Sequence, residues 1–262
     1  GKISQERLKD AWKQAAEGLR FAINFLRGNA GIDNLSYLSS PFLLVPISVY
    51  WILKKNEALT PEEEKRLLRW FYLAHMRGHY SMGSSESILD ADLGVLFKGK
   101  NLDDLVQQLF LHVKKFVVDY DDLNNRGIRS PFFSMLYFVL KQNGVKDWWS
   151  GLKLERHTGN AHIIQHHHIF PKSLLKQYDK KEVNEIANMA FIGGKANRQI
   201  TNKEPISYLE KEVIVKRGEE TLTSHLIPLD KKLWEIGNYR EFLTFRRKAI
   251  AEAINTFMKK FE

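Results

Sequence analysis

Three consecutive histidines, residues 166–168, precede isoleucine, phenylalanine and proline, and this stretch limits how the surrounding chain can fold. Proline cannot donate a hydrogen bond to a strand ladder, so Pro171 marks the end of a strand that contains the histidines. Residues 189–192 form a second β-prone segment, after which a Gly-Gly pair turns the chain into a helix. The sequence therefore predicts a strand, a long loop, a second strand, a tight turn and a helix.

The part of the chain before residue 150 has the pattern of helices instead. Apolar residues recur at helical spacing over residues 5–28, and Thr60-Pro61-Glu62-Glu63 is a typical helix start. Further helices are predicted at 102–116 and 131–141, and a C-terminal amphipathic helix at 240–261. We therefore expect an α+β chain, mostly α, with a helical domain at 1–150 and a second domain at 151–262.

Composition narrows the classes of protein to consider. The 262 residues contain no cysteine, which excludes disulfides, thiolate zinc sites and a cysteine nucleophile and suits a cytoplasmic location. The longest apolar run, residues 41–53, is too short for a membrane span, which needs about 20 residues. The first residues have no apolar core of a signal peptide and no initiator Met, so we expect a C-terminal part of a longer protein. A net charge of +9 favours a polyanionic partner such as DNA.

The histidines and two later asparagines suit one kind of chemistry. Phosphodiester hydrolysis needs an activated water, compensated phosphoryl charge and help for the departing oxygen. A neutral imidazole can accept the proton of water near neutral pH, and a divalent ion can supply the rest. Because neighbours on a strand point to opposite faces, His167 and His168 have different tasks unless the strand ends or bends there. Asn197, near the start of the following helix, could reach the same ion.

Together these residues resemble the HNH, or ββα-metal, nuclease family. Its motif reads an acidic residue or histidine, then His-Ile-x-Pro, then an asparagine at the second strand and another on the helix. The resemblance implies that His168 is the general base and His167 the first metal ligand. It implies that Asn188 orients the base and ties the loop, and that Asn197 is the second metal ligand. The implied products carry 5′-phosphate and 3′-hydroxyl ends.

A narrower resemblance covers roughly residues 40–262. The segments HHIFPKSLL, NEIANMAFI and KANRQITNKEPISYL look like the C-terminal HNH domain of GmrSD-type modification-dependent restriction enzymes. The segment FYLAHMRGHYSMGSSESIL resembles the helical stretch that precedes that domain. This implies an antiviral restriction hydrolase acting on DNA, including modified DNA, with an N-terminal NTPase or sensor domain upstream. This chain has no phosphate-cradling glycine-rich loop, so NTP hydrolysis is not predicted for it.

The identity of the metal is open at this point, because the motif supplies no carboxylate. Mg²⁺ prefers oxygen ligands, whereas imidazole suits Mn²⁺, Zn²⁺ or Ni²⁺. We expect Mg²⁺ or Mn²⁺, with Zn²⁺ and Ni²⁺ as alternatives. Four basic residues flank the motif and are predicted to contact substrate phosphates: Lys172, Lys195, Arg198 and Lys203.

Several other interpretations fit parts of the pattern. The histidine run could be a surface feature, or a structural zinc site together with His162, although such sites usually recruit thiolates. His75, His79 and His112 lie in the helical part and are interpreted as structural. The whole domain could be a catalytically inactive HNH-like module for DNA binding or assembly. An RNase with the same chemistry also fits, because the motif contacts phosphate and not sugar.

Overall fold

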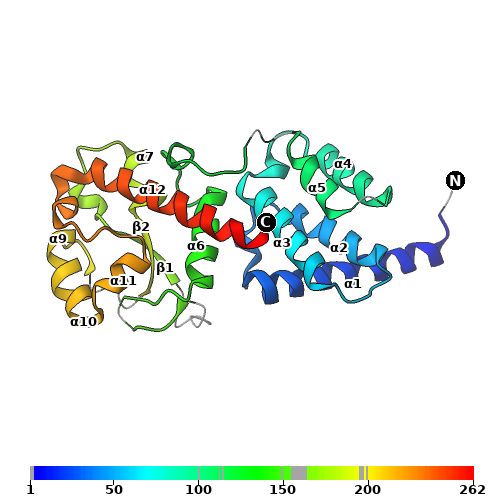
Figure 1. The fold of residues 1–262 in the computed structure, drawn as a ribbon, viewed down its shortest axis with the longest axis horizontal. Helices are drawn as coiled ribbons and strands as arrows, with labels where there is room; N and C mark the ends of the chain where they lie inside the picture. The colour runs from blue at the N-terminus through cyan, green and yellow to red at the C-terminus, as the bar shows by residue number, and fades with distance from the viewer. Residues whose placement is uncertain are drawn as a thin grey trace. The chain divides into compact units, whose positions relative to one another are not determined.

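The computed structural model describes residues 3–99, 101–111, 113, 115–148, 150–154, 164–194, 198 and 200–262. Across these residues the protein is mostly helical with a two-stranded antiparallel sheet (Figure 1), which agrees with the predicted α+β, mostly α, fold class. Packing divides the chain into two compact units, residues 1–116 with 258–262, and residues 117–257. None of the described helices combines the length and apolar content that crossing a lipid bilayer requires.

The first unit consists of helices whose ends follow local sequence signals. Thr60 and Glu63 form a reciprocal capping box, in which each side chain accepts a hydrogen bond from the other residue's backbone N–H. Ser84 caps the next helix. The first helix ends at Gly31, in the left-handed region with φ 66°, rather than at the predicted Gly28. The helices are α1 (Gln5–Ala30), α2 (Leu44–Leu53), α3 (Pro61–Met76), α4 (Ser85–Phe97) and α5 (Leu102–Leu109).

The two halves of α1 have different surroundings. In the N-terminal half, Leu8 and Trp12 are 55% and 77% exposed. In the C-terminal half, α1 packs closely on α2, because Gly18 has no side chain and a Cβ there would lie 2.7 Å from Ile52. The second half therefore anchors α1 in the first unit, while the apolar residues of the first half lie in solvent.

Two histidines of the first unit are buried, which agrees with their predicted structural role. His75 and His79 are both fully buried. The Nε2 atom of His79 lies 2.9 Å from Oδ2 of Asp92, and the Tyr80 hydroxyl donates to the same oxygen at 2.7 Å. These contacts pair the imidazole with a buried carboxylate inside the helical core. His112 lies outside the described residues.

The second unit contains the sheet and the remaining helices. Strand β1 (Ile164–His168) pairs antiparallel with β2 (Met189–Gly193), with His168 opposite Met189. The two predicted strands and the loop between them are therefore present. Gly194, Arg198 and Ile200 follow in helical conformation. The described helices are α6 (Pro131–Gln142), α7 (Lys180–Val183), α9 (Pro205–Tyr208), a π-helix at Leu209–Ile214, α10 (Val215–Arg217), α11 (Glu219–Ser224) and α12 (Tyr239–Met258).

Helix α6 belongs to the second unit, although the predicted boundary at 150/151 assigned it to the helical domain. Its residues Phe133 and Tyr137 pack on Phe191 of β2, with ring centroids 4.8 and 5.1 Å apart. The division by packing therefore lies at residues 116/117 and differs from the predicted boundary. The break in helical pattern after Asn143 ends a helix and does not end a compact unit.

Helix α12 covers the loop that follows β1. The rings of Tyr239 and Phe242 lie 5.1 and 4.8 Å from the ring of Phe170, measured between centroids. Phe245, which helical spacing places on the apolar side, is 44% exposed, whereas Arg246 is 1% exposed. Residue 246 follows 242 by four positions and so lies on the same face. The buried side of α12 thus includes a guanidinium that the sequence pattern assigns to the surface.

Candidate active site

The side chains of β1 alternate between two faces of the hairpin. His166 and His168 line one cavity, and His167 is buried at 3% exposure away from it. This follows from the two-residue period of a strand, since the ladder continues through His168. The histidine run is therefore split, with two members facing a cavity and one facing the interior.

The cavity on the His168 side has a volume of about 960 Å³. This is within the size range of small-molecule and substrate sites, about 300 to 1,000 Å³. Its lining combines imidazoles, cations and amides with the apolar side chains of Ile128 and Met189. The lining residues are Gly127, Ile128, Arg129, Ser130, Gln165, His166, His168, Lys172, Lys180, Asn184 and Met189.

His168 is held by Asn184, which comes from the loop between the strands. The Asn184 amide nitrogen donates to the carbonyl oxygen of Lys180 at 2.7 Å, which directs the amide oxygen toward His168. That oxygen lies 3.3 Å from Nε2 of His168. An amide oxygen only accepts, so Nε2 carries the proton in the neutral ring and Nδ1 holds the free lone pair.

The pKa of His168 is lowered to about 4, chiefly by desolvation and also by the nearby Lys172 cation, against the opposing hydrogen bond from Asn184. The imidazole is therefore neutral at pH 7 and can accept a proton. Burial lowers the pKa of His166 in the same direction. The ring of His166 packs edge-on against Phe133, with centroids 4.7 Å apart. The neutral ring of His168 has a lone pair that can accept a proton, and its low pKa makes it a weaker base than an ordinary histidine.

Asn188 ties the chain that follows β1. Its amide oxygen accepts from the backbone N–H of Phe170 at 2.8 Å, and its amide nitrogen donates to the carbonyls of Phe170 and Val183 at 3.1 and 3.0 Å. Its own carbonyl accepts from the N–H of Ile169 at 2.8 Å. This geometry matches the predicted loop-tying role. In the described hydrogen bond of the His168 ring, Nε2 donates to Asn184, a residue that the sequence interpretation missed.

His167 lies in an aromatic cluster on the other face of β1. Its Nε2 atom is 3.4 Å from the Tyr208 hydroxyl, which donates to the carbonyl of Ile169 at 2.9 Å. The ring of Trp148 meets His167 edge-on at 5.8 Å and meets His225 at 5.4 Å, measured between centroids. Burial lowers the pKa of His225 to about 4. The described partners of His167 thus place it among core residues.

The described residues give no support to the predicted metal site. His167 does not line the cavity that contains His168, and Asn197 lies outside the described residues. Across the part of the chain that the structure describes, no three His, Asp or Glu side chains converge in a way that could hold a metal ion. The described donors therefore do not form a complete metal site beside His168.

The four predicted phosphate contacts have different locations. Lys172 lines the cavity, whereas the Lys203 ammonium is ion-paired with Glu212 at 2.6 Å and is not part of the lining. Arg198 is exposed outside that lining, and Lys195 lies outside the described residues. The lining contains two further cations that the sequence interpretation missed, Arg129 and Lys180. Lys180 lies four positions before Asn184, a helical spacing that could have linked the two.

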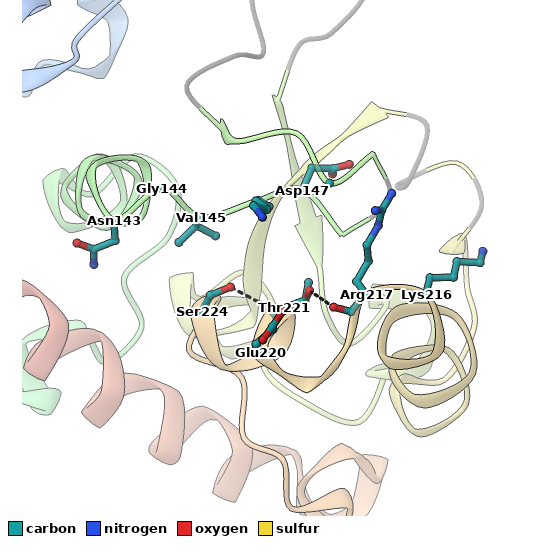
Figure 2. Close-up of a pocket in the computed structure, with 11 residues that line it drawn as sticks. Asn143, Gly144, Val145, Asp147, Lys216, Arg217, Glu220, Thr221 and Ser224 are labelled. Atoms are coloured by element: carbon teal, nitrogen blue, oxygen red, sulfur yellow. Dashed lines mark hydrogen bonds between the residues drawn. The ribbon is translucent and has the colours of Figure 1, made fainter.

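A second cavity in this unit has a volume of about 430 Å³ and lies between the turn after α6 and the helices α10 and α11 (Figure 2). Its lining combines the cations of Lys146, Lys216 and Arg217 with the carboxylates of Asp147 and Glu220. The Arg217 guanidinium lies against Gly151, where a Cβ would be 2.7 Å from Nη1. None of the described residues that the sequence predicted for catalysis lines it. Its mixed charge favours no single class of ligand, so the His168 cavity is the candidate site.

Comparison with protein-family models, with curated proteins and with solved structures finds no match for this chain. The resemblance to HNH nucleases is therefore still a prediction from the motif. The function proposed below rests on the His168 cavity and on that motif.

Proposed function

We propose that this protein is a phosphodiesterase that cleaves nucleic acid, most consistently DNA, at the His168 cavity. The observation that carries the proposal is a neutral imidazole, held by Asn184, in a cavity that also contains the cations of Lys172, Lys180 and Arg129. Cations at these positions can bind phosphate oxygens, and a neutral imidazole can take a proton from water. A restriction or antiviral role on modified DNA, with an N-terminal NTPase or sensor domain, is the biological context that the motif favours.

The proposed reaction uses the free lone pair of His168. Water attacks the phosphorus, and its proton passes to Nδ1 of the imidazole. The bond from phosphorus to the 3′ oxygen breaks, and that oxygen leaves with a proton from solvent as a 3′-hydroxyl. Lys172 and Lys180 hold the phosphate against the imidazole and offset its charge. By the HNH resemblance a divalent ion would stabilise the departing oxygen. No step is assigned to it, because the described residues form no complete donor set beside His168.

The test is nicking of supercoiled plasmid by the purified chain, with EDTA, Mg²⁺, Mn²⁺, Zn²⁺ or Ni²⁺, and with RNA of matched length in parallel. We expect His168→Ala to lower the cleavage rate by about 10²- to 10⁴-fold, the usual contribution of a general base. His166→Ala is the matched control, since it removes an imidazole from the same cavity without removing the proposed base. Wild-type nicking by His168→Ala would falsify the assignment.

A second candidate function is a nucleic-acid-binding or assembly module without catalysis. The observation that favours it is the placement of His167 in the aromatic cluster, away from the His168 cavity. The same preparations distinguish the two functions by fluorescence anisotropy with labelled DNA. If the wild type binds DNA but cleaves it with none of the divalent ions, the result supports the module. Cleavage by the wild type excludes it.

A further inference from the structure

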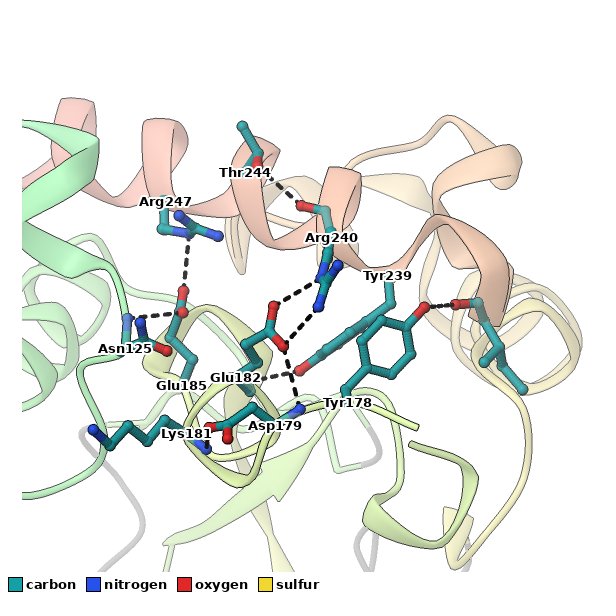
Figure 3. A network of polar contacts seen from close by, with 11 residues as sticks. Asn125, Tyr178, Asp179, Lys181, Glu182, Glu185, Tyr239, Arg240, Thr244 and Arg247 are labelled. Carbon is teal, nitrogen blue, oxygen red and sulfur yellow. Dashed lines mark hydrogen bonds and ion pairs between the residues drawn. The ribbon is translucent and has the colours of Figure 1, made fainter. Parts of the chain in front are cut away.

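Helix α12 directs three arginines toward the segment that connects β1 and β2. Arg240 donates to both carboxylate oxygens of Glu182 at 2.9 and 3.2 Å, and Arg247 forms an ion pair with Glu185 at 2.9 Å (Figure 3). The third arginine, Arg246, has a different kind of partner. Its contacts are with backbone and not with a carboxylate.

The Arg246 guanidinium is 1% exposed and donates to four backbone carbonyls. Nη1 donates to Ala187 at 2.7 Å and to Met189 at 2.8 Å. Nη2 donates to His225 at 2.9 Å, and Nε donates to Leu226 at 3.2 Å. Among the described residues, every hydrogen-bond partner of this side chain is therefore a main-chain oxygen.

Such a buried cation is unfavourable for stability alone. Desolvation lowers the pKa of Arg246 to about 9, because burial opposes the charged form. Replacing a buried charged group by a well-packed apolar side chain of similar volume is often neutral or stabilising. A role in fixing local geometry explains why a guanidinium occupies this position, since its planar fork defines the directions of several carbonyls at once.

Two of the carbonyls that Arg246 holds, those of Ala187 and Met189, lie on either side of Asn188. The amide group of Asn188 in turn holds the backbone of Phe170, two residues after His168, and the carbonyl of Val183, next to the residue that contacts the imidazole. Arg246 holds the 187–188 and 189–190 peptide groups, and the carbonyl of Asn188 between them accepts from Ile169. The backbone that carries the Asn188 side chain is therefore held on both sides. Hydrogen bonds joined through short stretches of backbone therefore link α12 to the chain after His168 and to the residue before Asn184.

We propose that Arg246 is a positioning residue for the His168 site, which it stabilises through Asn188 without touching the substrate. The predicted effect of Arg246 on the cleavage rate rests on the proposed function. The predicted effect of Arg246 on the geometry of the His168 imidazole does not depend on that function.

The test compares three variants of the full chain. Arg246→Met replaces the guanidinium by an apolar side chain of similar length, and Arg246→Lys keeps the charge but loses the planar fork. Arg240→Met is the matched control, because Arg240 lies on the same helix, contacts the same segment and is 66% exposed in its side chain. Circular dichroism and urea unfolding establish that each variant is folded.

Two measurements are made on each folded variant. In the cleavage assay at saturating DNA, we expect kcat to fall about 10- to 100-fold in Arg246→Met, with KM changed by less than about twofold. Nitrogen-15 spectra of the imidazoles, with the His168 signal assigned from His168→Ala, report the tautomer directly. We expect the Nε2-protonated form in the wild type and in Arg240→Met, and a mixture of tautomers in Arg246→Met.

The two measurements separate failure of the inference from failure of the proposed function. If the wild type does not cleave, the nuclease proposal fails and the His168 tautomer still decides the role of Arg246. Unchanged kcat together with an unchanged tautomer in Arg246→Met overturns the inference. If Arg246→Met does not fold, Arg246→Lys decides in the same way. We expect this variant to lose the single tautomer of His168, and retention of that tautomer would contradict the inference.

Discussion

His167 and His168 are neighbours in the sequence, yet they lie in different environments. His168 faces a cavity with Lys172 and is neutral at pH 7, while His167 is packed against Tyr208 and Trp148 in the interior. The alternation of side chains along β1 produces this difference. One position in a strand thus separates a side chain that a substrate can reach from one that supports the core, and the residue type alone does not reveal which is which.

The largest effect on folding should come from the interior histidine. We expect His167→Ala to lower the free energy of unfolding by about 2 to 3 kcal/mol, because it leaves a void among Trp148, Tyr208 and the hairpin. His168→Ala should lower it by less than about 1 kcal/mol, since its ring borders a cavity. Urea unfolding of both variants measures the difference. Equal losses of stability would show that the two faces of β1 are not distinct.

Acid should destabilise the interior face through His225. Its pKa is about 4 when folded and near 6.5 when unfolded, so the unfolded chain binds more protons between these values. The unfolding free energy should therefore fall, as pH drops from 6.5 to 4, by up to about 1.4 kcal/mol per pH unit for this group.

Replacement of this histidine tests that assignment. We expect His225→Gln to flatten the dependence of stability on pH below 6.5, measured by urea unfolding across pH 4 to 8. The range above pH 6.5 is the internal control, because His225 is neutral there in both states. A slope below pH 6.5 that is the same in the variant and the wild type contradicts the assignment to this residue.

The cavity face should respond to the charge at position 184. With a His168 pKa of about 4, cleavage should lose activity only as the pH falls through about 4. Asn184→Asp places an anion beside the imidazole and raises its pKa. A return of the His168 pKa to about 6.5 would lower the fraction of neutral imidazole at pH 5.5 about tenfold. The measurement is kcat against pH, with Asn184→Ser as an uncharged control. If the activity of Asn184→Asp and of the wild type fell at the same acidic pH, the contact between residue 184 and the His168 ring would be contradicted.

The smallest expected effects concern the cations of the cavity. Lys172→Ala and Lys180→Ala should each weaken DNA binding a few-fold and reduce the slope of log affinity against log salt by about 1. Lys203→Ala is the control, because this lysine is ion-paired with Glu212 and does not line the cavity. Anisotropy titrations between low and high salt measure these slopes. Equal effects at all three positions would mean that the cavity does not locate the DNA.

Local features of the fold could be predicted from the sequence. The capping residues Thr60 and Ser84 define helix starts, because a cap depends on a few neighbouring residues. The strand that ends before Pro171 is a local feature of the same kind. Features that neighbouring residues determine could therefore be predicted. The helix predicted for 102–116 is different, since it ends at Leu109, where no glycine or proline signals a stop.

Features that depend on distant contacts could not be predicted. The assignment of α6 to the second unit depends on Phe191, which lies more than fifty positions away in the chain. Lys180 and Asn184 lie at the two ends of the short helix α7, and only the folded chain brings this helix to His168. Arg246 has the composition of a surface residue. Its burial is determined by carbonyls from two separate segments, residues 187–189 and residues 225–226.

The contrast within α1 provides a spectroscopic signal that requires no label. Trp12 is 77% exposed, whereas Trp70, Trp148 and Trp234 are fully buried. An indole in water emits at longer wavelength than one in a protein interior and is open to soluble quenchers such as iodide. Any molecule that covers the N-terminal half of α1 should therefore shift this emission to the blue and reduce its quenching, and Trp12→Phe should abolish both changes.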